Sequence, residues 1–182
     1  MKTVLNIAGK SGSGKTYIAE YISNVYGIPM VESYTTRPPR TRNEKGHMFI
    51  SDVQYDSLEN KDKIAHTTFG GYKYCSMLSD LKELNTYVID EDGINYMQKN
   101  FKGDFNIYNL WIGVKDEVRI DGLNKEFGVS SAIKRINRDY GKFGNNGIEY
   151  DYIVKNNRTK AELEHEVDRI IKDITEKLKW EK

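Results

Sequence analysis

The sequence has few of the residues that crosslink a chain or divide it into separate units. It contains one cysteine, Cys75, and three prolines among 182 residues. A single cysteine cannot form an internal disulfide, so we expect a reduced compartment and a cytoplasmic location. The three histidines and Cys75 do not show the spacing of a structural metal site. The composition therefore excludes the disulfide-rich secreted class.

An excess of charge of one sign and a long apolar run are also absent. Lys and Arg total 28 and Asp and Glu total 27, which gives a formal net charge of +1. This balance argues against a broad basic surface for nucleic acid. The apolar segment near the N-terminus is short, so we expect neither a signal peptide nor a membrane span. The length fits one domain over residues 1–182.

The most informative segment is residues 9–16, Gly-Lys-Ser-Gly-Ser-Gly-Lys-Thr, which match the phosphate-loop pattern GxxxxGK[ST]. An apolar strand pattern precedes it at 3–8, and a helical pattern follows from Thr16 until Gly27. Glycines let successive backbone N–H groups point at an anion, and a helix N-terminus favours negative charge. We expect Lys15 to reach the β- and γ-phosphates of ATP and Thr16 to be a ligand of Mg²⁺. The predicted ATP-binding residues in this segment are Gly9, Ser11, Gly12, Ser13, Gly14, Lys15 and Thr16.

Strand patterns at 3–8, 28–34, 86–89, 107–114 and 150–154 alternate with helical patterns. This alternation predicts an α/β fold with a mostly parallel sheet, and together with the phosphate loop a three-layer P-loop NTPase fold. The expected core comprises residues 1–34, 81–118 and 147–182. Residues from about 35 to 80 contain short strand patterns and read as an inserted subdomain, while residues from about 119 to 146 are polar, helical and basic and read as a lid.

The loop at 33–42, Ser-Tyr-Thr-Thr-Arg-Pro-Pro-Arg-Thr-Arg, follows the second predicted strand. It should therefore emerge at the same sheet edge as the phosphate loop, where α/β proteins bind ligands. Arg37 and Arg40 offer planar forks that suit a phosphate, and the prolines between them stiffen the segment. A solvated basic turn is the alternative for this loop.

Several motifs in this chain resemble those of the guanylate kinase family of nucleoside monophosphate kinases. The family's Ser-x-Thr-Thr-Arg-x-Pro-Arg run is matched at Ser33, Thr35, Thr36, Arg37, Pro39 and Arg40, and further similar segments occur at 71–76, 89–93 and 150–156. The resemblance implies that residues 35–80 bind the acceptor nucleotide. It also implies that Arg37, Arg40 and Tyr74 hold the acceptor phosphate, that Ser33, Ser76 and Asp90 line the base pocket, and that Asn156 lies near the donor adenine.

Three positions depart from the family pattern. Glu44 is offset by one from the family's acidic residue, and His47 lies closest to the place of a phosphate-binding tyrosine. Ala65 occupies the position of the glutamate that pairs with guanine in the family. Because Ala65 has no oxygen that could accept a hydrogen bond from a guanine N–H, we expect the preference for guanine to be broadened or shifted. The phosphorylated substrate is expected to be GMP or dGMP or a broader set of monophosphates. Asp90 or Asp92 could take over the role of the missing glutamate.

The basic residues of the expected lid are candidates for the phosphoryl-transfer step. Arg135 and Arg138 lie three residues apart on one helix face, and Arg119 is a further candidate. Phosphoryl transfer needs positive charge near the moving group and exclusion of water, which a closing lid supplies. The alternative is an exposed helix whose basic residues are merely solvated.

The sequence as a whole predicts an ATP- and Mg²⁺-dependent nucleoside or deoxynucleoside monophosphate kinase. Its partners would be ATP and a nucleoside monophosphate, without nucleic acid or membrane, and the chain would be a monomer or a homodimer. Two alternatives stay open: a sugar-phosphate kinase similar to the ribose bisphosphate kinases, and a non-catalytic interaction module of guanylate-kinase-like fold. The complete phosphate loop argues against the module.

Overall fold

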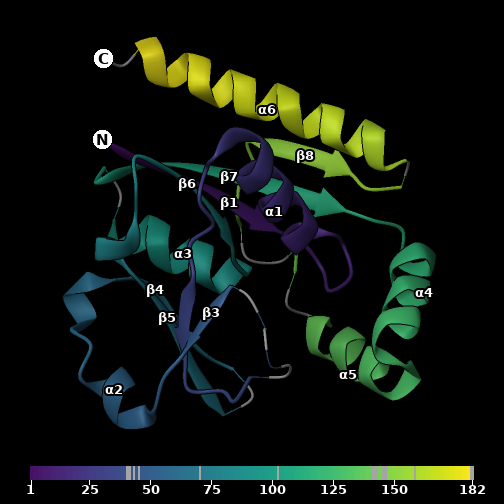
Figure 1. Ribbon diagram of the computed structural model, residues 1–182, viewed down its shortest axis with the longest axis horizontal. Helices are drawn as coiled ribbons and strands as arrows, with labels where there is room; N and C mark the ends of the chain where they lie inside the picture. Colours follow the sequence, from purple (N-terminus) through teal and green to yellow (C-terminus); the bar gives the residue numbers. More distant parts are fainter. Residues whose placement is uncertain are drawn as a thin grey trace.

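The computed structural model describes residues 1–39, 42, 44, 46–69, 71–101, 103–140, 143–144, 147–157 and 159–180. Its main sheet has the strand order β6–β1–β7–β8, and every pairing in it is parallel (Figure 1). The strands of this sheet are β1 (Lys2–Ala8), β6 (Leu84–Val88), β7 (Phe105–Gly113) and β8 (Tyr152–Lys155). The predicted parallel α/β architecture is confirmed.

Strand β1 is buried on both faces and therefore joins two hydrophobic clusters. Its residues Leu5 and Ile7 belong to the cluster formed with helices α1 (Lys15–Tyr26) and α6 (Lys160–Trp180). Val4 and Ala8 belong to the other cluster, which includes helix α3 (Glu91–Asn100). Because side chains of a strand alternate between its faces, this pattern places helices on both sides of the sheet. The result is the expected three-layer arrangement.

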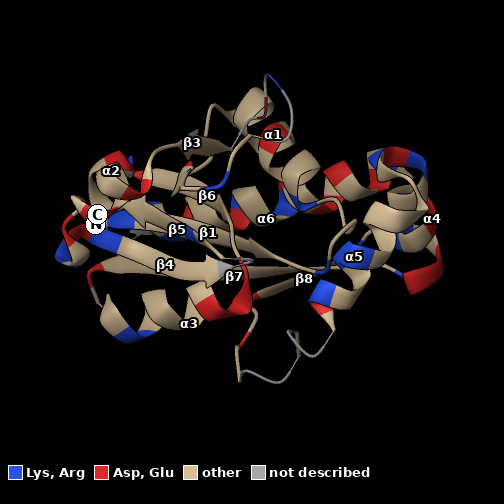
Figure 2. Cartoon of the chain, turned by 90° about the horizontal axis from the view of Figure 1, so that it is seen from below, with Lys and Arg blue, Asp and Glu red and all other residues tan. Residues whose placement is uncertain are grey.

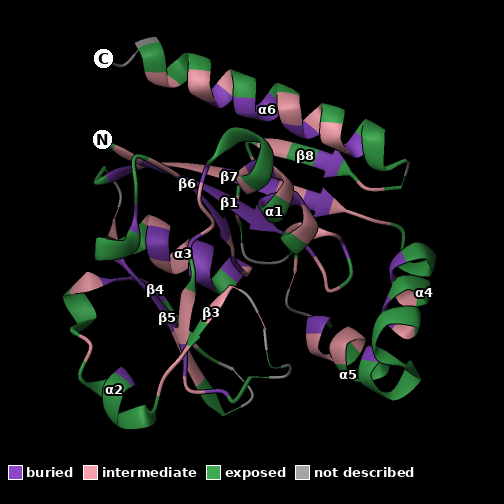
Figure 3. Cartoon of the chain, viewed as in Figure 1, coloured by how far each residue is buried: buried purple, intermediate pink, exposed green. Residues whose placement is uncertain are grey.

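The two helices of the first cluster have recognisable ends. Helix α1 stops at Gly27, which adopts a left-handed conformation with φ 68° and donates its N–H to the Ser23 carbonyl. Helix α6 begins after Thr159, whose hydroxyl accepts the Glu162 N–H while the Glu162 carboxylate accepts the Thr159 N–H. Figure 3 shows the buried stripe of α6 facing the sheet and its exposed side facing solvent. Both helices thus follow the sequence pattern closely.

A second sheet, with strand order β3–β2–β5–β4, occupies the predicted insertion. Its strands are β2 (Ser33–Thr35), β3 (His47–Phe49), β4 (Lys63–Phe69) and β5 (Tyr72–Met77). The short helix α2 (Asp52–Asp56) starts at a capping box made by Ser51 and Gln54. Strand β4 packs against α3, so the same helix contacts the second sheet and covers the main one.

The expected continuous strand at 28–34 is wrong. Thr86 of β6 donates its N–H to the Pro29 carbonyl at 2.9 Å and accepts the Val31 N–H at 2.8 Å, which makes only a short parallel bridge at Met30. Proline has no N–H with which to extend such pairing. The chain then leaves the main sheet, and Ser33 begins β2 of the second sheet.

The expected lid contains two helices, α4 (Asp116–Phe127) and α5 (Val129–Asp139), with Gly128 between them. Helix α4 thus begins three residues before the predicted start of the lid at 119. The two helices pack against each other beside the main sheet (Figure 1). Acidic and basic residues are interspersed over the molecule, as Figure 2 shows. Among the described residues, none of the helices combines the length and apolar character that a membrane span requires.

Candidate active site

The phosphate loop connects β1 to α1 and has little room for side chains at its glycines. Gly9 has φ 154°, and a Cβ there would lie 2.6 Å from the Ile112 carbonyl oxygen. Gly14 has φ 93°, and a Cβ there would lie 2.7 Å from Nδ2 of Asn156. The Gly9 contact is with a backbone atom that cannot move aside, so glycine is required there for close packing. At Gly14 the positive φ favours glycine, because other residues rarely adopt it.

Lys15 lies at the N-terminus of α1 with its ammonium group inside the curve of the loop. Its Nζ donates hydrogen bonds to the carbonyl oxygens of Gly9 at 2.6 Å and Lys10 at 3.0 Å. Burial lowers the pKa of Lys15 to about 8; Asp139 acts in the opposite direction, while Arg138 and Arg119 lower the pKa further. The ammonium is thus held at a position where a phosphate group would supply compensating negative charge.

Asn156, expected near the donor adenine, supports the loop from the β8 side. Its Nδ2 donates to the Ser13 carbonyl at 3.0 Å, and its backbone N–H donates to the Gly113 carbonyl at 2.7 Å. It does not line the cavity described next. Ser13 is also buried, so these two residues shape the loop rather than face the open side.

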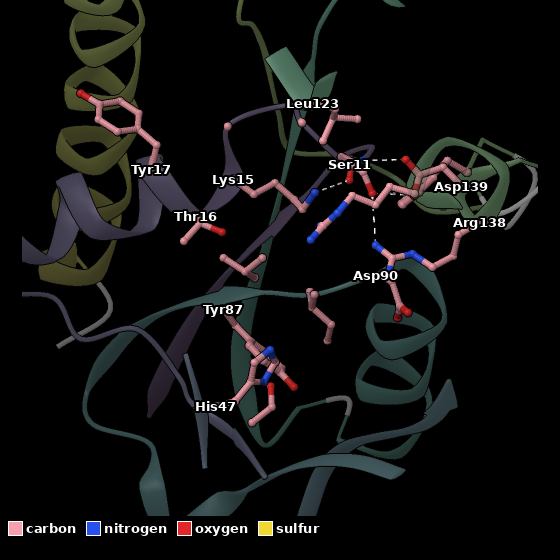
Figure 4. A pocket seen from close by; sticks show the side chains of 18 of the residues that line it. Ser11, Lys15, Thr16, Tyr17, His47, Tyr87, Asp90, Leu123, Arg138 and Asp139 are labelled. Carbon is pink, nitrogen blue, oxygen red and sulfur yellow. Dashed lines mark hydrogen bonds between the residues drawn. The ribbon is translucent and has the colours of Figure 1, made fainter. Parts of the chain in front are cut away.

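One cavity of about 630 Å³ extends from the phosphate loop to the second sheet and the lid (Figure 4). Its volume lies in the range of small-molecule sites. The lining residues from the loop and α1 are Gly9, Ser11, Gly12, Gly14, Lys15, Thr16, Tyr17 and Glu20. Those from the second sheet and the end of β6 are Ser33, His47, Thr67, Tyr74, Tyr87, Val88, Ile89 and Asp90, and those from the lid region are Leu123, Glu126, Phe127, Arg135, Arg138, Asp139 and Phe143.

Four residues named from the sequence line this cavity: Ser33, His47 and Tyr74 come from the second sheet, and Asp90 comes from the N-terminus of α3, after β6 of the main sheet. The Asp90 carboxylate also caps α3, since it accepts the Gly93 N–H at 2.9 Å. The His47 ring lies edge-on to Tyr74, with 6.0 Å between ring centroids. The second sheet therefore brings Ser33, His47 and Tyr74 together in the cavity, whereas Asp90 lies close enough to Lys15 to raise the pKa of that ammonium.

Ser76 does not line the cavity and instead contacts Tyr87, a residue that the sequence reasoning missed. The fully buried Ser76 hydroxyl lies 2.7 Å from the Tyr87 hydroxyl and 3.2 Å from the Glu32 carbonyl oxygen. Tyr87 is 4% exposed and lines the cavity. Burial raises its pKa to about 12, and hydrogen bonding with Ser76 and Ser33 acts in the opposite direction. Tyr87 is therefore a neutral hydroxyl at the floor of the second-sheet end.

Ala65 pairs with Ser76 across β4 and β5 and is 3% exposed. It belongs to the same buried cluster as Tyr87. The next residue on that face of β4, Thr67, does line the cavity. Thr67 could have been identified from the sequence, because side chains alternate along a strand and Thr67 follows Ala65 on the same face. Tyr87 could not, because it lies within an apolar strand pattern.

Arg37 lies outside the cavity lining, and its guanidinium is bound to Glu44. Nη2 and Nη1 of Arg37 donate to the two carboxylate oxygens at 2.7 and 3.2 Å, and Nη1 also donates to the Pro38 carbonyl at 2.8 Å. The side chain is 7% exposed and lies over the Phe49 ring. The offset of Glu44 noted in the sequence therefore still allows a bidentate pair. Arg40, the second predicted phosphate ligand, lies outside the described residues.

The lid arginines divide into two groups. Arg135 and Arg138 both line the cavity, and Arg135 lies over the Phe127 ring at 3.8 Å. Arg119 is buried away from the lining, where its Nε donates to Asp116 at 2.6 Å and its Nη1 donates to the Ser11 carbonyl at 3.4 Å. Arg135 and Arg138 thus lie in the wall of the cavity, while Arg119 is hydrogen-bonded to the phosphate loop.

One buried carboxylate, Glu91, and two ring contacts of Trp111 complete the surroundings. Glu91 accepts hydrogen bonds from the Tyr150 hydroxyl at 2.9 Å and the Gly144 N–H at 3.1 Å. Trp111 of β7 contacts Tyr150 and the cavity-lining Phe143, with ring centroids 5.3 and 5.7 Å apart. No periodicity or motif in the sequence distinguished Glu91 from its acidic neighbours.

Comparison with known proteins supports the fold. Solved structures with similar architecture include a guanylate kinase from Anaplasma phagocytophilum, which is 18% identical with a TM-score of 0.59 and matches over 97% of this chain and 86% of that chain. The chain has the predicted P-loop NTPase fold. A gluconokinase from Sinorhizobium meliloti 1021 is 14% identical with a TM-score of 0.52, over 98% of this chain and 97% of that chain.

An uncharacterized protein from Eubacterium ventriosum ATCC 27560 is 14% identical with a TM-score of 0.53, over 97% of this chain and 99% of that chain. Neither a protein-family model nor a curated protein sequence matches the chain. The guanylate-kinase-like fold expected from the motifs is therefore found in three dimensions. These structures do not identify the phosphoryl acceptor of this chain.

Proposed function

We propose that the chain is an ATP-dependent kinase that transfers the γ-phosphoryl group to a nucleoside or deoxynucleoside 5′-monophosphate. The observation that carries this proposal is the single cavity with the phosphate loop at one end and polar groups of the second sheet at the other. Such a cavity can hold two nucleotides with their phosphates facing each other. An oxygen of the acceptor phosphate would attack the γ-phosphorus, and the bond to the β-bridging oxygen would break to release ADP.

Each end of the cavity has a distinct part in this reaction. Lys15 and the loop N–H groups would hold the β- and γ-phosphates, while Tyr74 and His47 would contact the acceptor phosphate. Arg135 and Arg138 would stabilise the negative charge that spreads over the transferring group. Closure of the lid around both nucleotides would exclude water and limit hydrolysis of ATP.

Mg²⁺ fits the donor set at this site. The Thr16 hydroxyl and the Asp90 carboxylate both line the cavity, and hard oxygen donors of this kind suit the ion. Thr16 would hold Mg²⁺, and the bound ion would neutralise charge on the β- and γ-phosphates.

A sugar-phosphate or sugar-acid kinase is the second candidate, and the buried Ala65 favours it. The second-sheet end has hydroxyl groups at Ser33, Thr67 and Tyr87, and Ala65 supplies no carboxylate to pair with guanine. One of the structures of similar fold is a gluconokinase. Hydroxyls that surround Tyr87 would suit a polyhydroxylated acceptor as well as a base carbonyl.

The two candidates are separated by measuring ADP production from ATP and Mg²⁺ with a panel of acceptors. The panel contains the common ribo- and deoxyribonucleoside monophosphates, gluconate and a ribose bisphosphate, and Lys15→Ala is the inactive control. Because Ala65 removes a guanine partner, we expect at least one monophosphate besides GMP and dGMP to react with comparable kcat/KM. Selectivity for guanine on the order of 10⁴ would show that another group replaces the glutamate. Turnover with only the sugar acceptors would establish the second candidate. If none of the acceptors in the panel is phosphorylated, the non-catalytic module would be favoured.

A further inference from the structure

Asp139, the last residue of α5, is hydrogen-bonded to the phosphate loop. Its Oδ2 accepts the backbone N–H of Ser11 at 2.7 Å, and its Oδ1 accepts the Ser11 hydroxyl at 2.9 Å. Asp139 is 8% exposed and lines the cavity. A carboxylate with two short hydrogen bonds to one residue fixes that residue in both position and orientation. The lid is therefore attached to the loop at Ser11.

Ser11 also accepts hydrogen bonds from two lid arginines, Arg119 and Arg138. Its hydroxyl oxygen accepts from Nη2 of Arg138 at 3.3 Å, and its carbonyl accepts from Nη1 of Arg119 at 3.4 Å. The same Nη1 of Arg119 lies 3.6 Å from Oδ2 of Asp139. Three lid residues from two helices thus converge on one residue of the phosphate loop, as Figure 4 shows for Arg138 and Asp139. We call Ser11, Arg119, Arg138 and Asp139 the Ser11 clasp.

The charges of the clasp explain why a carboxylate is placed there. Arg119, Arg138 and Lys15 bring three positive charges to the loop, and Asp139 is the buried acid among them. After burial, Asp139 has the largest influence on the pKa of Lys15, which it raises, whereas the two arginines lower that pKa. Without the carboxylate these cations would repel one another in a region of low dielectric. Asp116 also pairs with Arg119 but is largely exposed to solvent.

We propose that Asp139 is a positioning residue that docks the lid on the phosphate loop and thereby holds Arg138 over the transferring phosphoryl group. This inference rests on the proposed kinase function. Asp139 acts through Ser11 and the arginines and takes no part in bond making or breaking. The clasp sets the position of the lid charge before the acceptor arrives, which lowers the cost of arranging it during the reaction.

The test compares Asp139→Asn with Asp121→Asn. Asparagine has nearly the same shape but loses the charge and one of the two acceptor oxygens. Asp121 also lies in the lid, on α4, but is exposed and pairs with Lys125 at 2.6 Å, so its substitution is the matched control. The readouts are hydrogen exchange of the Ser11 amide by NMR, kcat, and the KM for ATP.

For Asp139→Asn we expect faster exchange of the Ser11 amide and a decrease in kcat of about tenfold or more, with KM for ATP within about twofold of wild type. Asp121→Asn should match wild type in all three measurements. Asp139→Glu, which retains the charge, should recover part of the lost kcat. In a cycle with Ser11→Ala, the losses in kcat should be less than additive, because both substitutions break the same contact.

Unchanged exchange of the Ser11 amide in Asp139→Asn would overturn the clasp. Tighter ATP binding in this variant would also contradict it, because the carboxylate would then be a competitor of phosphate. If no acceptor supports turnover, the exchange measurement still decides whether Asp139 docks the lid, so the failure of the proposed function is distinguishable. Should Asp139→Asn fail to fold, Asp139→Glu decides. Protection of the Ser11 amide together with at least part of the wild-type kcat supports the role of the charge, and loss of both in a folded chain contradicts it.

Discussion

At the scale of single residues, Lys15 shows how position changes the chemistry of a side chain. Its ammonium is surrounded by loop carbonyls and two arginines, and burial brings its pKa from an ordinary 10.5 to about 8. In the free protein the group therefore loses its proton as the pH rises through about 8. Bound triphosphate favours the charged form, since opposite charges raise the pKa of an amine.

We therefore predict that ATP binding at about pH 9 takes up a proton and that ATP affinity decreases as the pH rises above about 8. Calorimetry in buffers of different ionisation enthalpy measures the uptake. Lys15→Arg is the control, because a guanidinium stays charged throughout this range. Equal proton uptake in Lys15→Arg and wild type would assign the effect to another group.

Tyr87 gives a prediction at the other end of the cavity. A hydroxyl has one proton, so when Ser76 donates to the Glu32 carbonyl, Tyr87 donates to Ser76 and keeps a lone pair for a ligand. Tyr87→Phe preserves the packing of the ring and removes this group. Loss of one hydrogen bond of about 1 kcal/mol should raise the acceptor KM about fivefold and leave the KM for ATP unchanged.

Steady-state kinetics with each substrate varied in turn tests this prediction. Tyr21→Phe is the control, since the Tyr21 hydroxyl bonds Asp168 of α6 and does not line the cavity. A parallel increase in both KM values would indicate a general disturbance of the site instead of acceptor recognition.

At the scale of elements, the lid helix α5 carries the clearest kinetic prediction. Arg135 lines the cavity and lies over the Phe127 ring, so its guanidinium is held in place by its own lid. A contact made mainly in the transition state affects kcat alone. Arg135→Ala should therefore lower kcat by about tenfold or more, with both KM values within about twofold. Lys125→Ala, in the exposed pair with Asp121, is the control. A large increase in either KM would show that Arg135 contributes to binding of the substrate in the ground state.

The elements also show which parts of the fold can be predicted from sequence patterns. The strand, loop and helix around residues 3–26 were predictable because local signals agreed: an apolar strand, glycines at strained positions and a helical repeat that ends at Gly27. The path of the segment at 28–34 was not predictable from the sequence, because its apolar pattern fits a strand of either sheet. Only tertiary pairing places Met30 beside the main sheet and Ser33 in the second sheet. Asp139 could not be predicted for the same reason, since its partner Ser11 is 128 residues away in the sequence. Tyr87 was missed because it lies within an apolar strand pattern.

At the scale of the whole molecule, β1 links the two hydrophobic clusters, so damage to it should affect the entire fold. Leu5 is 1% exposed and packs with α1 and α6. Leu5→Ala should lower the free energy of unfolding by about 2–5 kcal/mol, measured by urea titration with circular dichroism. Val25→Ala, at an exposed position of α1, should change it by less than about 0.5 kcal/mol. An equally small effect at Leu5 would mean that the clusters unfold independently of β1.

Three of the 13 tyrosines have a role at this scale that composition did not reveal. The hydroxyls of Tyr21 and Tyr26 bond Asp168, and that of Tyr152 bonds Asp173, so α1 and β8 are each tied to α6. These tyrosines combine an apolar ring with a polar tip, which suits the margin between core and solvent. Helix α6 is thus fastened by polar contacts along the edge of its buried stripe.

The edge-on and tilted ring contacts of Trp111 give this protein an internal optical probe. Its indole touches Phe143, which lines the cavity, and Tyr150, which is bonded to Glu91. Indole emission responds to the polarity and order of its surroundings. Substitution of the second tryptophan by Trp180→Phe leaves Trp111 as the sole tryptophan, which can be excited selectively over the tyrosines. Stopped-flow fluorescence of that variant would follow rearrangement behind the lid in real time, without a label attached to either nucleotide.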